Sequence, residues 1–176
     1  MKMLRTIRLD PSDAFVFERA AEPGEWAVPG AFVFLDVDPG TLEGKTRVAF
    51  RSGFLGIDSL GWSTLVQIVE ASDADQEAAL DLLAQRLMER FGAPDMDSAR
   101  AAAEEEFAFA ASLCNHAADT LIAMRRVYED GNIRETFRTL RPRGGEKPLR
   151  VFAFMEVEGD EEGGDAVDIV SLAKKP

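Results

Sequence analysis

The sequence predicts an α+β fold, a mainly antiparallel sheet with two long helices packed on one face. Strand-like segments lie near both ends of the chain, short loops join neighbouring strands, and two apolar stripes with helical spacing lie between them. The chain has 176 residues, of which 46% are hydrophobic and 30% charged, close to ordinary globular values. We therefore expect a single domain over residues 1–176 with a core of its own.

The N-terminal part is expected to supply several strands. Met3–Leu9 alternates polar and apolar side chains, which is typical of a strand with one buried face. Ala14–Glu18 has the length of a short strand, and Ala31–Val37 is almost wholly apolar, as in a strand buried on both faces. Trp62–Ala71 is rich in β-branched residues and is predicted to be a longer strand.

The segments between these strands are predicted to be turns and one short helix. Pro39–Thr46 is similar to a phosphate-binding loop, but Pro39 stands where that loop needs a glycine, so a turn is expected. Lys45–Leu55 fits a strand or a helix, and a helix is favoured because Gly56 could then cap it. Gly56–Gly61 is similar to a nucleophile elbow, but its first glycine is displaced by one residue, so a glycine-rich turn is predicted.

Two helices are predicted in the middle of the chain. Ser72 begins the first, because Asp75 stands at the capping-box position, and this helix runs to Phe91. The second is predicted as one long helix over Ser98–Glu129, a stretch without proline or glycine that carries a continuous apolar stripe. Cys114 lies within this stripe, so its thiol is expected to be buried and inert.

The C-terminal part is expected to form a hairpin of Ile133–Leu140 and Leu149–Val157, followed by a last strand at Val167–Leu172. Symmetric pairing of the hairpin would bury Phe137 on one face. On the other face it would set three pairs side by side: Arg138 with Val151, Thr136 with Ala153, and Arg134 with Met155.

Arg134 and Arg138 are therefore candidates for binding a partner. The guanidinium group of arginine binds a carboxylate or a phosphate through two parallel hydrogen bonds, so this face is suited to an acidic partner or an anion. The alternative is that these arginines pair with the protein's own surplus carboxylates.

The charge of the chain argues against several classes of partner. The net charge is −12, and residues 72–129 carry 5 basic and 12 acidic side chains, a net of −7. Phosphates of a nucleic acid or of an anionic membrane would be repelled, so no nucleic acid and no membrane is expected as a partner. A single cysteine cannot form an internal disulfide, and no apolar run approaches a membrane span, so a cytoplasmic protein is expected.

Catalytic and metal-binding patterns are weak. The chain has one histidine, His116, and neither a CxxC nor an HExxH pattern, so no metal and no cofactor is expected. On the predicted long helix, His116 would share a face with Ser112 and Asp119 and pair with one of them. The candidates for a small-molecule pocket between the sheet and the helices are Trp26, Asp58, Ser59, Trp62 and His116.

The phrases GEWAVPGAFVF and GFLGIDSLGWSTLV, in this order before two helices, resemble a small proteobacterial family of unknown function. The resemblance implies a bacterial protein and transfers no activity and no site residue. We expect a soluble binding or accessory protein that is non-catalytic and forms a homo-oligomer or binds a protein partner. The alternative is a small-molecule-binding enzyme that uses the pocket candidates named above.

Overall fold

The computed structural model describes residues 1–142, 155–158 and 167–168. Its helices are α1 (Gly44–Ser52), α2 (Asp73–Arg90) and α3 (Met96–Ser112). The strands, in chain order, are β1 (Lys2–Ile7), β2 (Trp26–Val28), β3 (Phe54–Gly56), β4 (Trp62–Ser63), β5 (Leu65–Glu70), β6 (Leu121–Glu129), β7 (Asn132–Pro142), β8 (Met155–Glu158) and β9 (Val167–Asp168).

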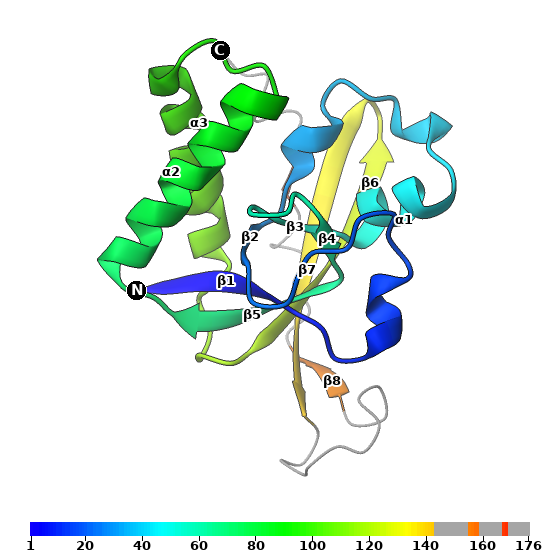
Figure 1. Cartoon of the computed structure of the whole chain (residues 1–176). Helices are drawn as coiled ribbons and strands as arrows, with labels where there is room; N and C mark the ends of the chain where they lie inside the picture. The colour runs from blue at the N-terminus through cyan, green and yellow to red at the C-terminus, as the bar shows by residue number, and fades with distance from the viewer. Residues whose placement is uncertain (143–154, 159–166, 169–176) are drawn as a thin grey trace.

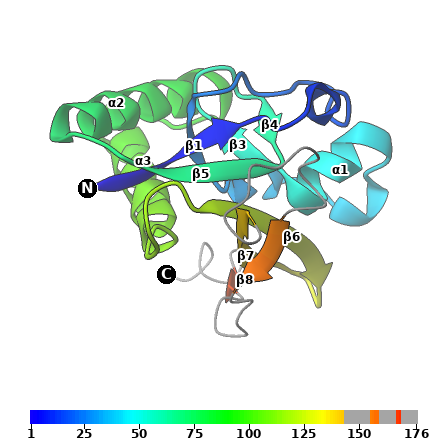
Figure 2. The ribbon, with the colours of Figure 1, turned by 90° about the horizontal axis from the view of Figure 1, so that it is seen from below.

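The strands form one sheet in the order β4-β3-β2-β1-β5-β6-β7-β8, with β9 also paired to β7, and every pairing between these strands is antiparallel. The helices α2 and α3 lie side by side at one end of the sheet, while α1 lies at the other end (Figures 1 and 2). The predicted α+β fold is therefore confirmed. None of the helices in the described part of the chain combines the length and the apolar character needed to cross a membrane.

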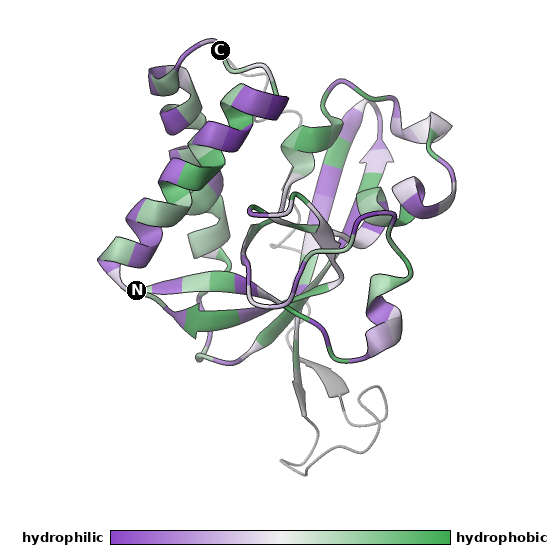
Figure 3. Ribbon diagram, viewed as in Figure 1, coloured by the Kyte–Doolittle hydropathy of each residue, from purple (hydrophilic) through white to green (hydrophobic). Residues whose placement is uncertain are grey.

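Helix α2 agrees with its sequence signals. The Ser72 hydroxyl accepts from the Asp75 amide and the Asp75 carboxylate accepts from the Ser72 amide, which completes the predicted capping box. Leu80, Leu83 and Leu87 are buried in the main core. Hydrophobic and hydrophilic bands alternate along the helix, as packing on one side requires (Figure 3).

The predicted long helix over Ser98–Glu129 is wrong. Helix α3 ends at Ser112, the chain turns through Asp119, which has a φ of 74°, and Leu121 begins β6. Asn115, Asp119 and Thr120 favour the break, because such side chains compete with the helix for backbone hydrogen bonds. The apolar spacing of Leu121–Tyr128 also suits a strand, and pairing with β7 along nine positions decides for the strand.

Three other sequence predictions are corrected at the N-terminal side. Ala14–Glu18 is not a strand: Ala14 ends a 3₁₀ helix at Pro11–Ala14, and turns and bends follow it up to Glu18. Ala31–Val37 is also not a strand, because Gly30 has a φ of 85° and starts a 3₁₀ helix over Ala31–Phe34. The helix predicted in Lys45–Leu55 exists as α1, but it ends at Ser52, and Gly56 belongs to β3 rather than to a cap.

The C-terminal pairing also differs from its prediction. Strand β7 forms its hairpin with β6 through Asp130 and Gly131, both at positive φ, a turn that matches the twist of a tight hairpin. Strand β8 pairs at the far end of β7, so Met155 lies opposite Pro142 rather than opposite Arg134. Val151 and Ala153 lie outside the described residues. Of the last predicted strand, Val167–Leu172, the first two residues form β9, opposite Arg134 and Glu135, and the others lie outside the described residues.

Candidate functional site

The region around β6 and β7 is organised by a fully buried ion pair. Arg126 on β6 and Glu135 on β7 are directly opposite in the sheet, and Arg126 Nη2 lies 2.7 Å from Glu135 Oε2. Glu135 Oε1 is also buried and has no hydrogen-bond partner among the described residues. Burial raises the pKa of Glu135, and Arg126 opposes that rise.

The remaining donors of Arg126 hold two other segments. The guanidinium donates to the carbonyl oxygens of Phe50 at 2.7 Å and Pro29 at 2.8 Å, with longer contacts of 3.4 Å to Ala49 and Gly53. The C-terminal end of α1 and the segment before the 3₁₀ helix at Ala31–Phe34 are therefore tied to the sheet. The guanidinium carbon also lies 5.6 Å from the centre of the Phe34 ring, within cation–π range.

A surface pocket of about 320 Å³ opens beside these tied segments, and we name it the Trp62 pocket. Its apolar wall comes from Val33, Phe34, Ala49, Leu60 and Trp62. Its polar rim comes from Glu18, Arg19, Lys45 and Thr46. The pocket therefore combines an apolar wall with two cations and one carboxylate.

The indole of Trp62 is held on several sides. It stacks on Phe34 with ring centres 5.3 Å apart and an interplanar angle of 27°. A Cβ added to Gly53 would lie 2.8 Å from the indole Cε3, so only glycine allows this close approach. Trp62 itself is half-buried, so part of its indole remains accessible to solvent.

Asp58 and Ser59 do not line the Trp62 pocket. Their backbone amides donate to Glu25 Oε1 at 3.1 and 2.9 Å, which holds the glycine-rich turn over Gly56–Gly61 in place. The Asp58 side chain pairs with Arg86 of α2 at 3.3 Å. These two residues have structural contacts, and the predicted turn is present.

Trp26 and His116 do not line the Trp62 pocket either. Trp26 is on β2, opposite Arg5 of β1, and packs at the edge of the main core. His116 is exposed in the loop after α3, where its backbone carbonyl accepts from Lys2 Nζ at 2.7 Å. The expected pairing of His116 along a helix is wrong because the helix ends at Ser112. The structure therefore does not bring the five pocket candidates together.

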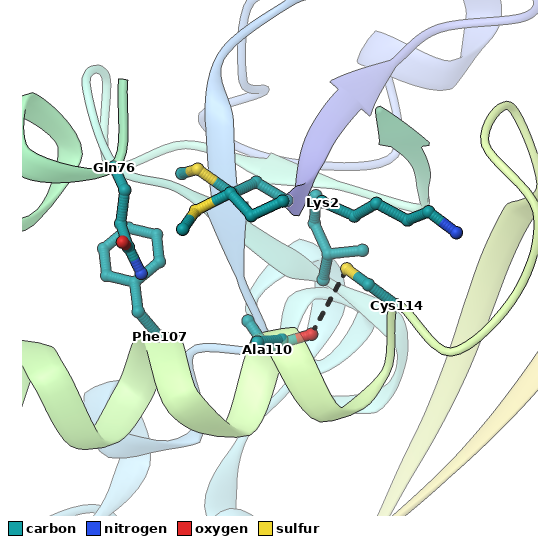
Figure 4. Close-up of a pocket in the computed structure, with 9 residues that line it drawn as sticks. Lys2, Gln76, Phe107, Ala110 and Cys114 are labelled. Atoms are coloured by element: carbon teal, nitrogen blue, oxygen red, sulfur yellow. Dashed lines mark hydrogen bonds between the residues drawn. The ribbon is translucent and has the colours of Figure 1, made fainter. Parts of the chain in front are cut away.

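A second pocket, of about 380 Å³, lies between β1 and the helices (Figure 4). Lys2, Gln76, Phe107, Ala110 and Cys114 contribute to its lining. Cys114 is buried, as predicted, and its thiol donates to the Ala110 carbonyl oxygen at 3.5 Å. Burial raises the pKa of the thiol to about 11, so it is protonated at neutral pH and a poor nucleophile.

Glu106 is the other carboxyl group with an unusual environment. Its Oε2 accepts from the Gly30 amide at 3.1 Å, which joins α3 to the segment that Arg126 also holds. Burial is the main cause that raises the pKa of Glu106 to about 7, and the Glu135 charge adds to this rise. Glu106 therefore titrates near neutral pH. No cluster of three histidine, cysteine or acidic side chains able to hold a metal occurs among the described residues.

The exposed face of β6 and β7 carries several arginines. In the sheet register, Arg138 lies opposite Ala123, and Arg125 lies opposite Thr136. Arg134, Arg138 and Arg125 are exposed, whereas Phe137 on the other face is buried, as predicted. Together with Arg5, which the pairing of β1, β5 and β6 places on the same side, these side chains form what we name the arginine face.

The arginine face has few internal partners. Arg134 Nε lies 3.7 Å from Glu129 Oε1, and both side chains are about half exposed. Arg5, Arg125 and Arg138 form no ion pair with the described residues. Exposed ion pairs are weak, so Glu129 does little to neutralise Arg134.

A family model matches residues 1–158. The chain belongs to DUF6505, a family of unknown function. No curated protein and no solved structure matches the chain. Membership of DUF6505 assigns no activity and no site residue, so the function has to be argued from the geometry described above.

Proposed function

We propose that this DUF6505 chain is a non-catalytic binding or accessory protein whose arginine face holds an acidic protein surface. The observation that carries the proposal is the exposure of Arg125, Arg134 and Arg138 on one sheet face of a protein with a net charge of −12. Desolvation by a partner would strengthen charge-assisted hydrogen bonds to these arginines.

The partner proposed first is a second copy of the chain. Residues 72–129 carry a net charge of −7, and exposed carboxylates there include Asp73, Asp97 and Glu105. In a two-fold dimer, the arginine face of each copy would meet the acidic helices of the other, so the contact occurs twice. This charge complementarity supports a homo-oligomer, and the same face would suit another acidic protein.

The test is a charge reversal by Arg134→Glu together with Arg138→Glu. Both side chains are exposed, so the variant should fold, and sedimentation velocity should show weaker self-association than in the unaltered chain. Arg47→Glu together with Arg51→Glu is the matched control, because these arginines are exposed and lie on α1, outside both the arginine face and the acidic helices. Raising the salt concentration should weaken the unaltered association.

Two results would contradict the proposal. One is a folded double variant that self-associates, and binds acidic proteins, as strongly as the control variant does. The other is an association that the control pair weakens just as strongly, because that would reflect net charge rather than the arginine face.

A second candidate function is the binding of a small molecule, and the Trp62 pocket favours it. Of the sequence candidates Trp26, Asp58, Ser59, Trp62 and His116, Trp62 is the one that lines this pocket in the described part of the chain. Ligand binding there needs no catalytic residue.

The proposed location is the bacterial cytoplasm. The resemblance of the N-terminal phrases to a proteobacterial family supports the source. Cys114 is the single cysteine and is buried, so no internal disulfide forms, which suits a reducing compartment. Fractionation of cells that produce the tagged chain tests the location, and recovery with the envelope would contradict it.

A further inference from the structure

The apolar wall of the Trp62 pocket is partly open to solvent. Phe34 and Ala49 are buried beneath it, while Leu60 and Trp62 are half-buried. Aromatic rings favour stacked or edge-on contact with a planar partner. The wall is therefore suited to an aromatic or other planar apolar group.

The rim of the pocket is cationic on balance. Arg19 and Lys45 are exposed, and neither forms an ion pair with a described residue. Arg19 makes one long contact, from Nη1 to the Ser59 carbonyl oxygen at 3.4 Å. Glu18 is the carboxylate of the rim, so the rim bears two positive charges and one negative charge. A single anionic group on a ligand would balance that excess.

The walls of the pocket are held before any ligand arrives. Arg126 donates to the carbonyl oxygens of Pro29 and Phe50 and lies over the Phe34 ring. One buried group therefore holds both α1 and the segment that carries Phe34. A preorganised pocket binds more tightly because less ordering is needed on binding. Its volume of about 320 Å³ lies at the lower end of the range of small-molecule sites.

We infer that the Trp62 pocket binds a small planar aromatic molecule bearing one anionic group, a carboxylate or a phosphate. The ring lies against Trp62 and Leu60, and the anionic group is bound by Arg19 and Lys45. The inference rests on the second candidate function, small-molecule binding at the Trp62 pocket, and names the ligand class. It is independent of the arginine face, which lies on β1, β6 and β7 and contributes no residue to this pocket.

The test uses the full chain with Trp26→Phe, which leaves Trp62 as the only tryptophan. The probes are para-nitrobenzoate and para-nitrophenyl phosphate, whose nitro groups quench indole fluorescence, with para-nitrobenzamide as the neutral counterpart. Saturable quenching by an anionic probe and much weaker quenching by the amide are expected. Competition by inorganic phosphate separates the two anions, since it should displace the phosphate ester if a phosphate is the preferred group.

Charge variants at the rim give the second part of the test. Lys45→Ala and Arg19→Ala should each weaken binding of the preferred anionic probe by about tenfold, the effect of losing about 1.4 kcal/mol. Glu18→Gln should tighten it, because a repelling carboxylate is removed. Arg47→Ala is the control on the same helix as Lys45 and should leave binding unchanged, as should Arg134→Glu with Arg138→Glu.

Several outcomes would overturn the inference. Equal binding of para-nitrobenzamide and para-nitrobenzoate would show that the pocket does not discriminate between a neutral and an anionic ligand. Binding that survives both Lys45→Ala and Arg19→Ala would place the probe elsewhere. Failure of both anionic probes to quench Trp62 at any soluble concentration would show that the pocket has no such ligand. The sedimentation result for the arginine face is independent of all three.

Discussion

Arg126 and Glu135 face each other across β6 and β7 as a completely buried ion pair, with Nη2 and Oε2 2.7 Å apart. Carbonyl oxygens from two other segments accept hydrogen bonds from the same guanidinium group, so the pair lies where the sheet, the end of α1 and the segment at Pro29 come together. The loss of one partner would leave a buried charge without its counter-ion.

Arg126→Met is expected to destabilise the protein strongly. The substitution removes the counter-ion of Glu135 and leaves the carbonyl oxygens of Pro29 and Phe50 without a donor, so a loss of about 3–5 kcal/mol in the free energy of unfolding is expected. Urea denaturation measures the loss. Arg125→Met, on the exposed face of the same strand, is the control and should stay within about 0.5 kcal/mol of the unaltered chain. Similar effects of the two substitutions would contradict a special role for Arg126.

Glu106 should make stability depend on pH near neutrality. The pKa of its carboxyl is raised from 4.5 in an ordinary setting to about 7 in the fold, so the folded state binds more protons between those values. The stability that this proton contributes is fully present below pH 4.5 and is lost as the pH rises through 7, with a total of roughly 3 kcal/mol.

Glu106→Gln tests this dependence, because the amide oxygen still accepts from the Gly30 amide while the titration disappears. The slope of stability against pH between 5 and 7 should flatten in this variant. Glu105→Gln removes an exposed carboxylate from the same helix and should keep most of the slope. If both variants keep the full slope, another group is responsible for it.

Cys114 should react slowly with thiol reagents in the native protein. The side chain is buried, so a reagent has little access to it. Burial also raises the pKa of the thiol to about 11, so little thiolate is present at pH 7. A chromogenic disulfide reagent should label the thiol promptly in urea and slowly without it. Prompt labelling of the folded chain would show that the pocket beside Cys114 opens to solvent.

Gly61→Ala should destabilise the turn that precedes β4. A Cβ at this position would lie 2.6 Å from the carbonyl carbon and oxygen of Ala20, which are backbone atoms and cannot swing aside. A loss of about 1–3 kcal/mol is expected from such overpacking, measured as a lower urea midpoint. Gly40→Ala is the control, because the nearest atom to its Cβ is a side-chain oxygen of Asp38 at 3.3 Å. Equal losses in the two variants would count against the steric explanation.

The parts of the fold that follow from local signals could be predicted. Ser72 and Asp75 mark the start of α2 by their own hydrogen bonds, so that helix needs no distant contact to be recognised. Beyond Ser112 the apolar spacing fits a helix and a strand equally well, and pairing with distant strands decides between them. The Asp130–Gly131 turn was the local signal that could have revealed the β6–β7 hairpin. The single-domain boundary at 1–176 stays a prediction.

Only part of the candidate site could be predicted, because some of its contacts join segments that are distant in the sequence. The alternation along Arg134–Arg138 is local, and it correctly predicts which side chains are exposed. Which residues surround Trp62 depends on long-range contacts, so the sequence indicates Trp62 but gives no sign that Lys45 and Arg19 lie beside it. No sequence motif marks Arg126 and Glu135 as a buried ion pair. Their burial depends on packing against α1, which is distant in the sequence.

The contact between Arg126 and Pro29 also constrains the order in which the protein can mature. Ninety-seven residues separate the two, so a nascent chain that ends just after α1 has the aromatic rings of Phe34 and Phe50 but not the cation that lies over both. The two rings can contact each other without β6, but the guanidinium group that covers both is added only after β6 has been synthesised. The Arg126 contacts that hold the walls of the Trp62 pocket therefore form late in synthesis, and a truncated product lacking β6 would lack them and expose more apolar surface.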